Sequence, residues 1–213
     1  MIFKLVVFDL DGTLIDSVKV HAEGWAYAFN VLGLANVKAK ALEDLIGLPG
    51  GTIVERILGQ AGLEHYQKIR WLKDRHFLKY VMGNSVRLFP DVIQCFQYLR
   101  RRNYLLGIAT STPNYILIPL LEKLSIIEYF NIVVGGDEVS RGKPEPDIFL
   151  RAAEKAGLPP REVVVVGDTI YDTIPARKVG MFSVLIARNK NLRLSEVVAD
   201  AVITDLNDLS AFL

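Results

Sequence analysis

From residue 91 onward, short apolar segments alternate with helical segments, and this alternation limits the fold more than any other feature of the chain. The segment Val163–Val166 is apolar on both faces, as central strands of a parallel sheet are. Strands are expected at residues 104–109, 131–134, 163–166, 182–186 and 201–203, and helices at 91–102, 113–124, 146–156 and 172–179. Repeated strand–helix units predict an α/β fold, a three-layer Rossmann-like parallel sheet with right-handed crossovers.

One more strand, Phe3–Phe8, opens the chain and is followed by a long block that contains no convincing strand. Helices are expected in this block at residues 17–32, 38–46, 52–61 and 64–81, the third of them opened by a capping box from Thr52 to Glu55. The block is interpreted as an all-α cap domain inserted after the first strand. The predicted division is a core domain of residues 1–15 and 90–213 and a cap domain of residues 16–89.

Composition excludes several classes of protein. The chain has 213 residues, a formal net charge of +1 and one cysteine, Cys95, in an apolar helical setting typical of a buried structural thiol. The near-neutral charge argues against nucleic-acid binding, which requires a basic surplus. No apolar run reaches the roughly 18 residues that span a bilayer, and the first residues enter a strand directly instead of forming a signal peptide. We expect a cytoplasmic protein, a monomer or homodimer, that binds neither nucleic acid nor membrane.

Polar side chains follow four of the expected strands. In open α/β sheets ligands bind at the carboxyl ends of the strands, so these side chains are expected to converge on one site. They are Asp9 and Asp11 after the first strand, Thr110 and Ser111 after the second, Lys143 in the segment after the third, and Asp168 and Asp172 after the fourth. Each residue alone can also be explained as a helix cap, a turn residue or a solvated lysine. Their occurrence together, in this order, favours a site.

The same residues give the chain its resemblance to a known family. The four motifs of the haloacid dehalogenase-like hydrolase superfamily match, in order, Asp9-Leu10-Asp11-Gly12-Thr13-Leu14, Thr110-Ser111, Lys143-Pro144, and Gly167-Asp168 with Asp172. The resemblance covers essentially the whole chain, and the helical insert is similar to the small cap of the phosphoglycolate phosphatase-like branch. One departure is Pro175-Ala176-Arg177, where a smaller, glycine-containing segment would be expected.

The resemblance implies a phosphatase that acts on a small phosphorylated metabolite. Asp9 would attack the phosphoryl group to form an aspartyl-phosphate, and Asp11 would serve first as the acid for the leaving group and then as the base for water. Thr110, the Ser111 amide and Lys143 would bind the phosphoryl oxygens.

The resemblance also implies Mg²⁺ as the cofactor, held by the Asp9 side chain, the Asp11 carbonyl and Asp168, with Asp172 in the outer shell. Charge supports this expectation independently. Two like charges 4 Å apart repel by about 4 kcal/mol at an effective dielectric of 20. Because Asp9, Asp168, Asp172 and a substrate phosphate bring several such pairs together, Lys143 alone cannot offset the repulsion.

The cap is implied to supply selectivity, because the core motifs recognise only a phosphoryl group. Its loop 47–51, and Gly47 in particular, is a candidate for substrate contact, although a plain helix–helix turn explains the loop equally well. Arg56 can bind a substrate carboxylate or face solvent. Trp25, Phe29 and Trp71 are expected in the core of the cap.

Several activities remain open. Asp11 favours a phosphatase over a dehalogenase, which needs no such acid, and a phosphonate hydrolase would have a small residue there. A phosphosugar mutase shares Asp11 and a similar cap, and a pyrophosphatase has the same charge requirements. Outside the enzymes, a receiver-type phosphoacceptor domain also combines acidic residues, a hydroxyl and a lysine around Mg²⁺, but its acids are adjacent and it lacks a helical insert. The substrate, phosphoglycolate or another small phosphomonoester, is also open.

Overall fold

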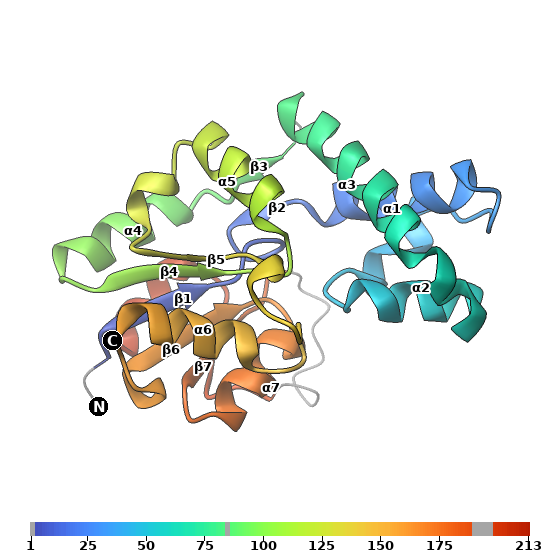
Figure 1. The fold of residues 1–213 in the computed structure, drawn as a ribbon. Coiled ribbons are helices and arrows are strands. Elements are labelled where there is room, and N and C mark those ends of the chain that lie inside the picture. The colour runs from blue at the N-terminus through green and yellow to red at the C-terminus, as the bar shows by residue number, and fades with distance from the viewer. Residues whose placement is uncertain (1–2, 84–85, 189–197) are drawn as a thin grey trace. The chain divides into compact units, whose positions relative to one another are not determined.

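The computed structural model describes residues 3–83, 86–188 and 198–213. The chain forms two compact units (Figure 1), one of Met1–Ile15 with Leu88–Leu213 and the other of Asp16–Arg87. The first unit carries a six-stranded sheet and the second is helical. In the part of the chain that is described, no helix is both long enough and apolar enough to cross a membrane.

The sheet of the first unit is parallel throughout, as the sequence predicts. Its strand order is β5-β4-β1-β6-β7-β8. The strands are β1 (Leu5–Phe8), β4 (Leu105–Ala109), β5 (Ile132–Val134), β6 (Val163–Gly167), β7 (Phe182–Ile186) and β8 (Ala201–Ile203). The central strands β1 and β6 are buried along their whole length, which explains why both are apolar on both faces.

Helices cover both faces of this sheet, which completes the predicted three-layer α/β fold. They are α4 (Val92–Arg101), α5 (Asn114–Lys123), α6 (Asp147–Ala156) and α7 (Ile170–Lys178). Figure 1 shows α4 and α5 on one side of the sheet and α6 and α7 on the other. On the α6 side, Leu5 and Val7 of β1 share a hydrophobic core with Phe149. On the α4 side, the Phe8 ring lies 5.4 Å from that of Phe96.

The strand order places a switch in chain direction beside β1. The chain runs from β1 to β4 and β5 on one side, then crosses back to β6, β7 and β8 on the other. In open α/β sheets, ligands bind at the carboxyl ends of the strands at such a switch point. The fold therefore directs attention to the residues that follow β1, β4 and β6.

Pro119 lies inside α5, and its place in the helix explains how it is tolerated. Proline has no N–H to donate to the carbonyl four residues earlier, which normally weakens a helix. Pro119 is exposed, however, while Ile116, Leu117, Leu120 and Leu121 form the buried face of α5. The carbonyl that loses its helical donor therefore lies on the side that water can reach.

The helical unit differs from the sequence prediction in three places. Residues 38–46 form two single-turn 3₁₀ helices, Ala39–Ala41 and Glu43–Leu45, where one α-helix was expected. Helix α2 (Gly50–Leu58) begins two residues before Thr52, so the predicted capping box is wrong. The same helix, expected to reach residue 61, stops at Leu58, and a 3₁₀ helix follows. The remaining elements are α1 (Val18–Val31), the 3₁₀ helix Gln60–His65 and α3 (Tyr66–Met82).

The helical unit has a hydrophobic core of its own. Trp25 and Phe29 of α1 are buried in it together with Ile53 and Ile69, as predicted for the two aromatic residues. The prediction for Trp71 is wrong, because its side chain is 54% exposed and is stacked by the guanidinium of Arg75, 4.8 Å from the ring centre.

Two short strands were missed by the sequence prediction. Strand β2 (Ile15–Asp16) and strand β3 (Arg87–Leu88) pair as a separate two-stranded sheet, at the two points where the chain passes between the units. Strands of two residues are too short to show any periodicity in the sequence.

Candidate active site

The predicted site residues of the core converge at the carboxyl edge of the sheet. Phe8, the last residue of β1, is in register with Ile108 of β4 and Val166 of β6. Asp9 is the next residue along β1, and its amide donates to the Val166 carbonyl at 2.9 Å. Thr110 and Asp168 each follow the ends of the two neighbouring strands. Three adjacent strands therefore deliver polar side chains to the same edge.

Lys143 joins two of the carboxylates. Its ammonium donates to Asp9 Oδ1 at 2.5 Å and to Asp172 Oδ1 at 2.6 Å. The lysine is only 6% exposed, and its Nζ lies 5.2 Å from the centre of the Phe149 ring. It comes from the loop between β5 and α6, so the third predicted motif meets the first and the fourth.

Asp168 is held by the turn that follows β1. The Thr13 hydroxyl donates to Asp168 Oδ1 at 3.1 Å, and Thr13 itself is fully buried. Gly12 allows this approach, because its φ is +81° and a Cβ at this position would overlap the Asp168 carboxylate. The sequence motif contains Thr13, but sequence reasoning assigned it no part in the site.

Asp172 is fixed at the start of α7 by a capping box. Its Oδ2 accepts from the Thr169 amide at 3.1 Å and from the Thr169 hydroxyl at 2.8 Å, while Oδ1 accepts from Lys143. Both carboxylate oxygens thus have protein donors, which suits an outer-shell position better than direct ligation. Thr169 was also missed, although threonine followed three residues later by an acid is a recognisable cap pattern.

Asp11 is tied to the loop after β4. Its Oδ2 accepts from the Thr112 hydroxyl at 3.1 Å, and the Thr112 amide donates to Thr110 Oγ1 at 3.2 Å. Thr110 is buried and Ser111 is exposed at the same loop. Thr112 is the residue that links the first motif to the second, and only its position beside Thr110 and Ser111 could have suggested it.

A family model for haloacid dehalogenase-like hydrolases matches residues 6–186. The chain belongs to this family. It is 31% identical over 229 aligned positions to the phosphoglycolate phosphatase of Shigella boydii, covering 96% of this chain and 90% of that protein. It is 35% identical over 179 positions to the phosphoglycolate phosphatase of Yersinia pseudotuberculosis, covering 82% and 77%.

Solved structures agree with this assignment. A predicted phosphoglycolate phosphatase from Haemophilus somnus superposes with a TM-score of 0.84 and 25% identity, covering 99% of this chain and 97% of that one. The family expected from the motifs is therefore confirmed, and so is the expected enzyme class, a phosphatase.

The site of this haloacid dehalogenase-like hydrolase holds more negative charge than its lysine neutralises. Burial raises the pKa of Asp9 to about 7 despite the opposing charge of Lys143, and the charges of Asp172 and Asp11 add to the increase. Burial, then the charges of Asp172 and Asp9, raise the pKa of Asp168 well above its ordinary range. Burial disfavours the Lys143 ammonium, but Asp172 and Asp9 outweigh it and raise its pKa. A further cation would relieve this imbalance.

The donor set fits a hard divalent cation. Asp9, Asp168 and Asp172 each offer a carboxylate oxygen, and these three oxygens lie within 4.8 Å of one another. Oxygen ligands from a few carboxylates, with room for a phosphate, are the environment that Mg²⁺ prefers. The residues present can therefore hold the expected metal.

Gly47 belongs to the helical unit and not to this cluster. It is exposed and has a φ of +102°, so it makes the turn that precedes α2. Arg56 is likewise exposed on α2. The contact of Gly47 with substrate stays a prediction.

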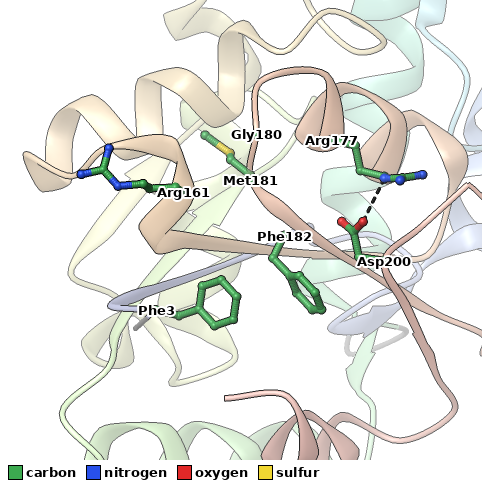
Figure 2. Close-up of a pocket in the computed structure, with 7 residues that line it drawn as sticks. All are labelled: Phe3, Arg161, Arg177, Gly180, Met181, Phe182 and Asp200. Atoms are coloured by element: carbon green, nitrogen blue, oxygen red, sulfur yellow. Dashed lines mark ion pairs between the residues drawn. The ribbon is translucent and has the colours of Figure 1, made fainter. Parts of the chain in front are cut away.

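A hollow at the opposite edge of the sheet contains none of the predicted site residues (Figure 2). It is lined by Phe3, Arg161, Arg177, Gly180, Met181, Phe182 and Asp200. Phe3 precedes β1 and Phe182 begins β7, so this hollow lies at the amino ends of the strands. Arg177 is paired with Asp200 at 3.0 Å in this hollow.

Proposed function

We propose that the protein is a Mg²⁺-dependent phosphomonoester hydrolase that uses Asp9 as its nucleophile. The observation that carries the proposal is the meeting of Asp9, Lys143, Asp168 and Asp172 at one edge of the sheet, from three separate parts of the chain. The convergence of these motifs supports a single site that brings a nucleophile, cationic groups and metal ligands together.

In the first step, an Asp9 carboxylate oxygen attacks phosphorus, and the bond from phosphorus to the substrate oxygen breaks. Asp11 gives its proton to the departing alkoxide. In the second step, Asp11 takes a proton from water as the water oxygen attacks phosphorus, and the bond to Asp9 breaks. Inorganic phosphate leaves, and both carboxyl groups return to their starting states.

The surrounding residues position these two carboxyl groups and the phosphoryl oxygens. The Thr112 hydroxyl holds one oxygen of Asp11, which leaves that carboxyl group with a fixed orientation. Lys143 opposes the effect of burial on Asp9 by favouring its carboxylate form, and it offsets charge on the phosphoryl group together with Thr110 and the Ser111 amide. Mg²⁺ held by Asp9 and Asp168, with Asp172 behind them, would neutralise the charge that a substrate phosphate adds.

The substrate class follows from the relatives and from the site. The curated relatives are phosphoglycolate phosphatases, so phosphoglycolate is the first compound to test. Other small phosphomonoesters and pyrophosphate meet the same charge requirements.

Replacing Asp9 tests the proposal directly. Asp9→Asn keeps the size of the side chain but removes the nucleophile, and phosphate release from phosphoglycolate should fall by at least about a thousandfold. Phosphate release is measured in Mg²⁺ and, as a second arm, after stringent metal removal with excess EDTA, where turnover should disappear. Equal release by the variant and the wild type would remove Asp9 from this role.

Product analysis separates the related activities. With a hexose 1-phosphate, a phosphatase yields free hexose and phosphate, whereas a mutase yields the hexose 6-phosphate. A stable phosphoprotein without phosphate release would instead indicate a phosphoacceptor domain.

A further inference from the structure

Arg188 connects the turn after β1 to the amino end of α4. It follows β7, and its Nη2 and Nε donate to the Thr13 carbonyl at 2.8 and 3.3 Å. Its Nη1 donates to Asp91 Oδ2 at 2.6 Å. The guanidinium also packs over the Phe89 ring, 4.1 Å from the ring centre.

Thr13 is thereby held at both ends. Arg188 binds its carbonyl, and its hydroxyl donates to Asp168 Oδ1. Thr13 has no exposed surface, so a change in its backbone cannot be absorbed by moving into solvent. A displacement of Arg188 would therefore move Thr13, and with it the Asp168 carboxylate.

The need to neutralise Asp91 does not by itself explain why residue 188 is an arginine. Asp91 is 6% exposed and needs a positive partner, but a lysine ammonium could provide that charge. The planar guanidinium has several donors in a fixed arrangement, which lets it bind the carboxylate and the Thr13 carbonyl at the same time. This double contact connects Arg188 to Thr13, which bonds to Asp168 in the candidate active site.

We propose that Arg188 is a positioning residue, which holds Thr13 so that the Thr13 hydroxyl keeps Asp168 oriented for the metal. The proposal rests on the metal site of the proposed function. Partners that orient a metal ligand typically change metal affinity about 10- to 100-fold when they are removed. Arg188 contacts Thr13, Asp91 and the Phe89 ring, and of these Thr13 is the one that bonds to Asp168, so its effect is expected to pass through Thr13.

The test measures metal affinity directly, by titrating the metal-free protein with Mn²⁺ and following free Mn²⁺ by electron paramagnetic resonance. Arg188→Lys keeps a positive charge beside Asp91 but loses the double contact. Thr13→Val removes only the hydroxyl bond to Asp168. Each variant should bind Mn²⁺ about tenfold more weakly than the wild type. In the double variant the second change should add less than about a twofold further loss, because both act on one chain of contacts.

Arg177→Met is the matched control. It also removes an arginine that pairs with an aspartate, Asp200, but at the opposite edge of the sheet, and its Mn²⁺ affinity should equal that of the wild type. A merely structural role for Arg188 predicts a lower melting temperature with unchanged Mn²⁺ affinity in Arg188→Lys. That result, or losses that multiply in the double variant, would overturn the proposal.

The two proposals fail separately. A wild-type protein that binds Mn²⁺ with the expected variant pattern but releases no phosphate overturns the proposed function and leaves the role of Arg188 standing. A wild-type protein that binds no divalent cation overturns both.

Discussion

Gly12 determines how closely the turn after β1 approaches the Asp168 carboxylate. The turn after β1 takes Gly12 through a positive φ and brings its Cα against the Asp168 carboxylate, where a side chain has no room. The same turn supplies the Thr13 hydroxyl that orients Asp168. Glycine is therefore needed here for close approach as well as for backbone conformation.

Gly12→Ala separates these two needs when it is compared with Gly180→Ala. Gly180 has a φ of +80°, against +81° for Gly12, and nothing lies within 4 Å of its Cβ position. Gly180→Ala should lower the free energy of unfolding by about 1 kcal/mol, the cost of a left-handed alanine, and Gly12→Ala should lower it further because the new Cβ overlaps the Asp168 carboxylate. Only Gly12→Ala should weaken Mn²⁺ binding, by about tenfold or more, because it displaces Asp168. Equal Mn²⁺ affinities in the two variants would contradict this expectation.

The raised pKa of Asp9 predicts an unusual pH dependence of stability in the metal-free protein. The unfolded-state pKa of an aspartate is about 4, and the folded value here is about 7. The folded protein thus binds the proton more tightly, so this contribution to stability is complete below about pH 4 and is lost as the pH rises through 7. Asp168, whose pKa is also raised, acts in the same direction.

Thermal melts in EDTA should therefore show the melting temperature falling between about pH 5 and pH 8. Asp9→Asn should reduce the fall, because the amide does not titrate. Added Mg²⁺ should raise the melting temperature more at pH 8 than at pH 5, since it competes with protons for the same oxygens. A melting temperature that rises with pH in EDTA would show that these carboxyl groups are not held in their protonated form.

At the scale of single elements, the sequence predicted the core better than the helical insert. The strands at 182–186 and 201–203 have the predicted bounds, and α5 differs from its prediction by one residue at each end. Strong apolar periodicity fixes such elements. Residues 38–46 lack it and form 3₁₀ turns, while α2 starts on two glycines that ordinarily mark a loop.

Pro119 provides a test at this scale. Pro119→Ala restores the missing donor on the exposed side of α5, and the free energy of unfolding should rise by about 2 kcal/mol. Urea unfolding with an unchanged m-value measures this gain. Pro175→Ala in α7 is the comparison, because Pro175 is also inside a helix but is buried, so the gain there is reduced by the space that the ring leaves. A loss of stability in Pro119→Ala would contradict the account given for α5.

At the scale of the whole molecule, the sequence predicted which residues at strand ends would converge in the candidate site, but it did not predict the contacts between segments that lie far apart in the chain. Asp9, Lys143, Asp168 and Asp172 each follow a recognisable strand or precede a helix, and the structure brings them together. Arg188 left no such signal, since its partners Thr13 and Asp91 lie 175 and 97 residues away in the chain. Only the folded sheet places these segments side by side.

The pairing of β2 with β3 has a consequence for how such an enzyme diversifies. The two ends of the helical unit are joined by the β2–β3 pair. For the chain of the sheet unit, the whole insert is therefore equivalent to one loop whose ends are held together. Lengthening a closed loop costs little, roughly 0.6 kcal/mol for each doubling. An insert of different size or sequence can therefore be accommodated at this junction without moving a strand of the six-stranded sheet.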